Sequence, residues 1–261
     1  MGAIQAALRI IVTIIFIIVG GKLSGQAVYK PKSSIAYNWN AKFYVGKTQY
    51  YGDVSHDDKM EKLRSEAKLS IGASLTKEIN PILGITADFF YTKLFSKKGN
   101  NNQPFPTVYE LYGTYYDFTI SPRVDLVNVI ADSRLDVRFS AYITLGLGYG
   151  IWNTTVENIT TGEIVGGQTN KYVGGLVIPT TVALDYRLTS WFSIFVDGQI
   201  RIIVNDRLDN WEDGWQTDQL FVANIGISFD FDFKYHVKPS DINRSRISEE
   251  YMKKVNRGVR Y

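Results

Sequence analysis

Hydrophobic and polar residues alternate along residues 219–233, which read QLFVANIGISFDFDF. The odd positions from Phe221 to Phe233 are apolar, and the even positions from Val222 to Asp232 are mostly small or polar. A period of two places these two sets on opposite faces of a β-strand. The apolar face would meet a second sheet in a soluble sandwich, or lipid in a membrane barrel whose polar face points inward. Because a polar segment follows, this is the last predicted strand.

The same alternation recurs in seven earlier segments, each bounded by turn-forming or charged residues. We predict strands at residues 34–45, 66–76, 82–95, 111–124, 135–151, 172–186 and 191–204, in addition to 219–233. Pro179 interrupts the sixth segment and predicts a bulge or a frayed pair there. Long connections alternate with shorter ones, which is typical of outer-membrane barrels with short periplasmic turns and long external loops. The pattern predicts an all-β fold, namely an eight-stranded antiparallel up-and-down transmembrane β-barrel with a periplasmic C-terminal tail.

The two ends of the chain differ from the barrel segment at 28–233. In residues 1–27, Arg9 precedes the apolar run 10–19, and small residues end the segment. This layout predicts a signal peptide cleaved after Gly25 or Ala27, because the run is shorter than the roughly 20 residues that a membrane-spanning helix needs. Residues 234–261 form a basic tail with eight Lys or Arg against three Asp or Glu.

Composition supports a barrel and excludes several kinds of site. Aromatic residues make up 14% of the chain, as expected where rings line two membrane interfaces. There is no cysteine, so disulfides and thiolate metal sites are excluded. With only His56 and His236, we expect neither a histidine-based metal site nor a cofactor. The surplus of basic residues lies in the tail, so the overall charge does not predict nucleic-acid binding.

Charged residues of both signs fall on the predicted inward face. An eight-stranded barrel is just wide enough for side chains to fill its interior. We therefore expect opposite charges to pair and plug the barrel, because buried charges are stabilising only as a satisfied network. The predicted interior network comprises Lys42, Asp88, Asp117, Arg123, Asp136, Arg138, Asp197 and Arg201, with Lys68 and Asp185 on the same face.

An enzymatic function is the least favoured hypothesis. Ser55, His56 and Asp57 stand together in the first predicted loop. Adjacent loop residues cannot build the hydrogen-bonded relay of a catalytic triad, so ordinary loop polarity explains them better. We expect no catalytic residue. The alternative, an outer-membrane lipid-modifying enzyme, would depend on His56.

The basic tail and two external loops are candidate binding segments. Ser248 can cap a short amphipathic helix. The tail could then dock on an acidic periplasmic partner, attract anionic lipid headgroups, or remain a solvated end. The acidic loop at 209–218 carries Trp211 and Trp215, which are candidate anchors for a surface partner. The predicted partner-binding residues of the tail are Arg244, Arg246, Tyr251, Met252, Lys253, Lys254 and Val255.

The last predicted strand carries a recognisable motif. Asn224, Gly226, Phe229 and Phe231 resemble the β-signal that the bacterial barrel-assembly machinery reads on a final strand. This resemblance implies an outer-membrane protein of a bacterium, with the assembly machinery and outer-membrane lipid as partners.

A second resemblance concerns function. The Tyr50-Tyr51-Gly52-Asp53 sequence after the first predicted strand and the overall plan are similar to small outer-membrane barrels of Bacteroidota, in particular the PorG-type barrel of type IX secretion and gliding motility. The resemblance covers roughly residues 34–233. It implies a non-enzymatic anchor for a periplasmic ring of a secretion or motility machine. The alternative is a barrel that binds a surface partner through its external loops.

Overall fold

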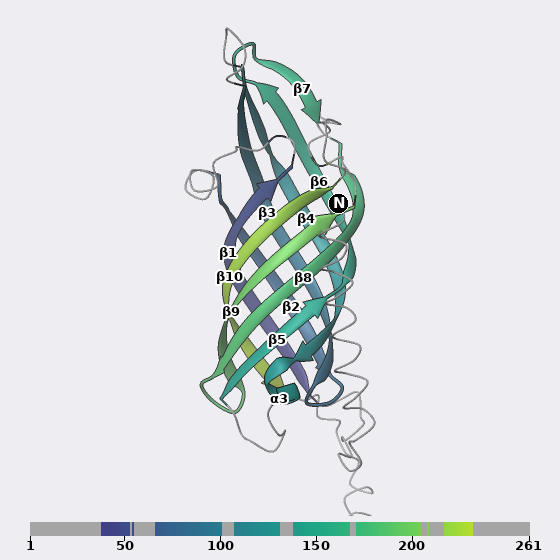
Figure 1. Cartoon of the computed structure of the whole chain (residues 1–261), viewed down its shortest axis with the longest axis vertical. Helices are drawn as coiled ribbons and strands as arrows, with labels where there is room; N and C mark the ends of the chain where they lie inside the picture. Colours follow the sequence, from purple (N-terminus) through teal and green to yellow (C-terminus); the bar gives the residue numbers. More distant parts are fainter. Residues whose placement is uncertain are drawn as a thin grey trace, which may run out of the picture.

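The computed structural model describes residues 38–52, 54, 66–100, 107–130, 138–167, 171–204, 208 and 217–231. The predicted signal peptide and basic tail lie outside these residues. Ten strands form one antiparallel sheet that curls into a tilted barrel (Figure 1). The strands are β1 (Trp39–Tyr51), β2 (Lys68–Glu78), β3 (Leu83–Asn100), β4 (Thr107–Asp125), β5 (Phe139–Leu145), β6 (Leu147–Asn158), β7 (Glu163–Gly167), β8 (Val173–Arg187), β9 (Phe192–Ile203) and β10 (Asp218–Phe231), and one short helix, α3 (Leu126–Ile130), follows β4.

The sheet closes on itself through its first and last strands. β1 pairs with β10 in one unbroken register, from Trp39 opposite Phe231 to Tyr51 opposite Gln219. Every other neighbouring pair in the ring is also antiparallel. Strands β5 and β6 occupy one place in the ring, between β4 and β8, and β7 pairs with β6 alone among the strands that the structure describes. The ring therefore has eight members, which confirms the predicted up-and-down barrel.

The predicted fifth strand is divided in two at Gly146. Its register with β8 is the same on both sides of the break, because Leu145 faces Thr180 and Gly148 faces Val177. The Gly146 amide still donates to the Pro179 carbonyl at 2.9 Å. Proline has no amide hydrogen to return a bond, so the ladder is interrupted for one step. Pro179 thus interrupts the pairing in an unchanged register, which is the frayed pair of the two predicted outcomes and not the bulge.

Several strands extend further from the membrane than predicted. β3 continues to Asn100, β6 continues to Asn158, and the β6–β7 hairpin occupies most of a segment predicted to be a loop, 153–170. The predicted ends were wrong because apolar alternation stops where lipid contact stops, whereas backbone pairing continues in water. At the opposite end, β2–β3 and β8–β9 are joined by short turns, which mark the periplasmic side. The segment after β4, predicted to be a turn, contains α3.

The outer wall of the barrel is apolar. Large side chains that point away from the lumen are exposed, including Phe43, Val45, Ile71, Phe89, Phe118, Leu147, Leu176, Val182, Val196 and Ile225. Aromatic rings gather at both borders of this belt. Near the periplasmic turns, Trp191 stacks on Phe229 with ring centroids 6.1 Å apart. Nearer the external end, Tyr91 contacts Tyr116 at 4.9 Å and Tyr51 contacts Phe221 at 4.8 Å. Such girdles flank the lipid-facing band of membrane barrels. Among the described residues, no helix has the length and apolar character needed to cross a bilayer.

A charge on this wall should be costly in proportion to its depth. Val196→Arg is expected to lower the free energy of unfolding by about 2–4 kcal/mol, because the arginine must enter hydrocarbon. Ile164→Arg in β7 is the matched control. Both side chains are 48% exposed, but Ile164 lies in the hairpin beyond the belt. Reversible urea unfolding in lipid vesicles measures both variants. Equal costs would contradict the assignment of the wall to lipid.

Candidate functional site

The middle of the lumen is held by one arginine. Arg201 of β9 is 1% exposed and forms ion pairs with Asp117 of β4 at 2.5 Å and Asp88 of β3 at 2.7 Å. Its guanidinium also donates to Gln199 at 2.7 Å and lies 4.0 Å from the centre of the Phe90 ring. A planar guanidinium with several donors can serve all these partners at once. This cluster therefore ties β9 to strands on the opposite wall.

A second cluster lies closer to the periplasmic end. The ammonium of Lys42 in β1 lies 2.8 Å from Asp185 in β8 and donates to the Tyr142 hydroxyl at 2.8 Å. Lys42 is 4.3 Å from the centre of the Tyr142 ring, and the Arg123 guanidinium lies 4.1 Å from the same centre. Arg123 is also 3.9 Å from Asp185. The Tyr142 ring thus contacts two cations, and both cations also lie near the Asp185 carboxylate.

Hydrogen bonds extend both clusters to the neighbouring strands. Tyr44 donates to Asp88 at 2.8 Å, and Asn224 donates to Asp197 at 2.7 Å. Because Asn224 lies in the closing strand β10, its side chain links the seam of the barrel to the polar interior.

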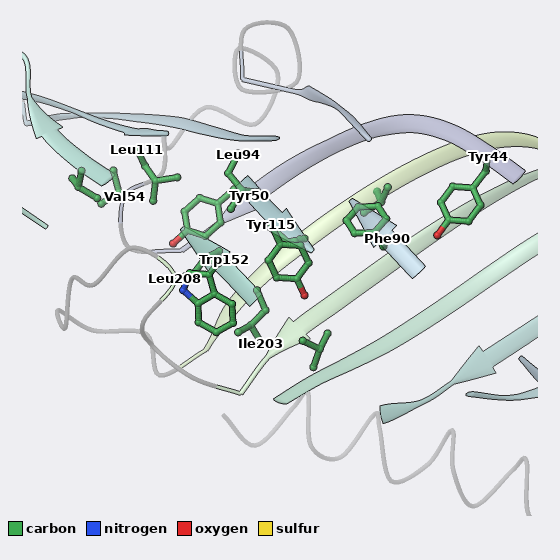
Figure 2. Close-up of a cluster of buried hydrophobic side chains, with 14 of the residues drawn as sticks. Tyr44, Tyr50, Val54, Phe90, Leu94, Leu111, Tyr115, Trp152, Ile203 and Leu208 are labelled. Atoms are coloured by element: carbon green, nitrogen blue, oxygen red, sulfur yellow. The ribbon is translucent and has the colours of Figure 1, made fainter. Parts of the chain in front are cut away.

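The external half of the lumen is mainly apolar. Large buried side chains from β1, β3, β4, β6, β9 and β10 meet there (Figure 2). The Tyr115 and Trp152 rings stack with centroids 6.3 Å apart. We call this cluster the aromatic plug. It contains Tyr50, Val54, Leu94, Leu111, Tyr115, Trp152, Val156, Ile203, Leu208 and Leu220.

Buried polar contacts hold the top of the aromatic plug. Asp218, at the start of β10, accepts hydrogen bonds from the Tyr50 hydroxyl at 2.6 Å and from the Leu208 amide at 3.1 Å. The Thr154 hydroxyl donates to the Leu208 carbonyl. Leu208 lies in the segment between β9 and β10, and these hydrogen bonds hold it in the lumen. The aromatic plug and the charged clusters together fill the barrel, which supports the predicted plugged interior over a conduction path.

The periplasmic mouth of the lumen is open and forms a polar cavity of about 430 Å³. We call it the periplasmic cup. Within it, Asn40 donates to Asp230 at 2.6 Å. Asp125 accepts a bond from the Asn128 amide at 2.8 Å and another from Ser140, which holds α3 against the rim. Charged residues of the lining are Glu78, Arg123, Asp125, Arg138, Asp185, Arg187 and Asp230.

The predicted interior residues fall into three groups. Lys42, Asp117, Arg123, Asp197 and Arg201 are buried in the lumen, and Asp88 is partly buried beside Arg201. Arg138 is the exception. It is exposed at the rim of the periplasmic cup, because β5 begins one residue later than this position. Asp136 lies outside the described residues.

The remaining candidates divide between β10 and segments that the structure does not describe. Asn224 and Gly226 face the lumen, and a Cβ at Gly226 would lie 2.6 Å from the Phe195 ring, so the position requires glycine. Phe229 joins the periplasmic girdle, and Phe231 faces Trp39 across the seam. Recognition of this motif by the assembly machinery stays a prediction. The tail residues, His56 and His236 lie outside the described residues. Among the described residues, no three potential ligands gather at a metal site.

Sequence reasoning missed the aromatic plug. Those of its members that lie in strands stand at inward positions beside apolar outward neighbours, as in Leu94-Phe95 and Tyr115-Tyr116. An apolar residue on each face removes the alternation that identifies a half-polar strand. The available signal was this local loss of alternation near the external ends of β3 and β4.

This chain is similar to several proteins of known structure. No protein-family model matches the sequence, and no curated protein matches it. Solved structures with a similar fold include Neisserial surface protein A, with 13% identity, 74% of this chain and 97% of that chain covered, and a TM-score of 0.44. They also include Ail, the attachment invasion locus protein of Yersinia pestis (14%, 76% and 100%, 0.44), and OprG from Pseudomonas aeruginosa (13%, 76% and 97%, 0.38).

The cellular location of the chain follows from the structure itself. A closed antiparallel ring with an apolar belt, two aromatic girdles and a polar lumen pairs the backbone groups of neighbouring strands without water, as a bilayer requires. Short turns at one end and long extensions at the other are those of bacterial outer-membrane barrels. The chain is therefore a β-barrel of the bacterial outer membrane, in contact with outer-membrane lipid.

Removing one charged partner of the Arg201 cluster should lower the stability of the barrel far more than removing all of its charges. Arg201→Met is expected to destabilise the barrel by about 3–5 kcal/mol, because it leaves two carboxylates buried without a cation. Adding Asp88→Asn and Asp117→Asn should restore most of this stability. Lys97→Met, which removes a half-exposed partner of Glu110, is the control and should cost less than about 1 kcal/mol. Unfolding in vesicles measures each variant, and a triple variant less stable than Arg201→Met would refute the account.

Proposed function

We propose that this barrel is a non-enzymatic structural anchor that holds a periplasmic protein complex at the outer membrane. The observation that carries the proposal is the contrast between the two halves of the lumen. Charged clusters and the aromatic plug fill the barrel, whereas the periplasmic cup is open and lined by polar side chains. A filled lumen supplies rigidity without a route for solute. Its accessible polar surface therefore faces the periplasm.

Both ends of the barrel domain lie on the periplasmic side, which also supports a periplasmic partner. β1 begins and β10 ends at the periplasmic mouth, with Trp39 opposite Phe231. The basic segment 234–261 follows β10, so its attachment point lies at the rim of the periplasmic cup. A basic segment tethered there is presented at high effective concentration to any acidic partner below the membrane. The resemblance to PorG-type barrels makes a type IX secretion or gliding-motility complex the proposed assembly.

Removing the tail tests this proposal. Deletion of residues 239–261 should leave a barrel that still shifts in gels on heating, because the described ladder ends at Phe231. Proteins that co-purify from gently solubilised outer membrane should be lost. A full-length variant with Arg244, Arg246, Lys253 and Lys254 changed to Gln should show the same loss if charge carries the contact. Retention of every partner by the deletion variant would exclude the tail as the dock.

The external hairpin supports a second candidate function, binding of a surface partner. β6 and β7 project beyond the membrane as a paired ladder, and Ile159, Ile164 and Val165 are exposed on it. An ordered, partly apolar projection can serve as an adhesive surface. Replacing residues 159–166 by a short Gly-Ser turn should abolish attachment of cells to a host or surface ligand under this hypothesis, while deletion of the tail should not. Under the anchor proposal, deletion of the tail should remove the co-purifying proteins, and replacement of the hairpin should not.

A further inference from the structure

The outer wall carries a shallow apolar groove across β10, β1, β2 and β3, about 590 Å³ in volume. Its floor is Ala73, which stands between Phe43 of β1 and Phe89 of β3 in the register of the sheet. A small residue between two exposed phenylalanines leaves a trough along the strand direction. The lining residues of this wall groove are Phe43, Tyr44, Val45, Ile71, Gly72, Ala73, Phe89, Ile225, Gly226 and Ile227.

Two exposed lysines stand directly on the external side of the wall groove. Lys47 follows Val45 by one outward position in β1, and Lys93 lies two outward positions beyond Phe89 in β3. Leu69 of β2 faces Lys47 and separates the two lysines. Strands lie about 4.8 Å apart, so the two Cα atoms are roughly 10 Å apart across β2. Both lysines lie within strands, so the regular pairing of β1, β2 and β3 sets the spacing between them.

The position of the lysines along the barrel places them at headgroup depth. Lys93 follows Tyr91, whose ring contacts Tyr116 in the external girdle. Lys47 lies between the apolar belt at Val45 and the girdle at Tyr51. A lysine near such a border extends its ammonium to the interface while its methylene stem stays in the apolar zone. From these positions both ammonium groups can extend to the phosphates of the outer leaflet.

We propose that this wall binds one phosphorylated glycolipid of the outer leaflet. The ammonium groups of Lys47 and Lys93 contact its phosphate, and one acyl chain lies in the wall groove over Ala73. Charge complementarity selects the phosphate, and the apolar trough below selects the chain. A phospholipid of the inner leaflet would place its headgroup at the opposite end, beside Lys77 and Trp39. The proposal depends on the membrane location and is independent of the anchor function.

Native mass spectrometry of the full chain in non-ionic detergent tests the headgroup contact. The probes are bis-phosphorylated lipid A, fully dephosphorylated lipid A and phosphatidylglycerol. We expect one tightly bound bis-phosphorylated lipid A per barrel, and weaker binding by roughly tenfold or more in the Lys47→Gln/Lys93→Gln variant. The control is Lys77→Gln/Arg187→Gln, which removes the same charge at the periplasmic end and should bind as the unaltered chain does.

A second pair of variants tests the acyl-chain contact. Ala73→Phe fills the floor of the wall groove, whereas Ala141→Phe adds the same ring to the lipid-facing side of β5, away from the groove. We expect only Ala73→Phe to weaken lipid A binding, with both variants folded by the heat-shift criterion. Equal binding by the lysine variant and its control would overturn the proposal. Equal affinity for phosphatidylglycerol or for dephosphorylated lipid A would overturn the assigned lipid class.

Discussion

The pairing of β1 with β10 is the contact on which the rest of the structure depends. In a bilayer, an open sheet edge would leave backbone donors and acceptors without partners, at a cost of several kcal/mol for each group. The register from Trp39 to Tyr51 removes that edge completely. Closure also creates a lumen cut off from lipid, where charged side chains can be placed. Both the apolar wall and the polar interior are consequences of this one seam.

The interior solves a second problem, that of burying charge. Arg201, Lys42 and Arg123 lose water, and each recovers interactions from carboxylates and aromatic faces that come from distant strands. Aromatic rings beside the cations exclude water and still offer a favourable electrostatic surface. Because each cluster joins opposite walls, it also resists flattening of the barrel. The aromatic plug fills the external end of the lumen. The surfaces that remain available for binding are the periplasmic cup, the external hairpin and the lysines above the wall groove.

Much of this architecture was readable from alternation. The period of two placed Phe43 and Val45 toward lipid and Lys42 toward the lumen, and the short turn before β3 was identified correctly. Strand ends were predicted poorly at the external side, where the contrast between lipid and lumen disappears but pairing persists. Arg138, predicted in the interior network, lies at the exposed rim of the periplasmic cup, because β5 starts only at Phe139.

The sequence by itself determined the eight members of the ring, the side of the sheet that most strand residues occupy and the apolar character of the outer wall, because these follow from local periodicity. Only the tertiary structure decided which inward charges meet. Arg201 and Asp117 are far apart in sequence and become neighbours only when curvature and strand register bring β9 across the lumen from β4. The aromatic plug has the same origin, because it joins side chains from strands whose mutual distance is set by closure of the ring, and no local pattern encodes that distance. The wall groove depends instead on the register of neighbouring strands.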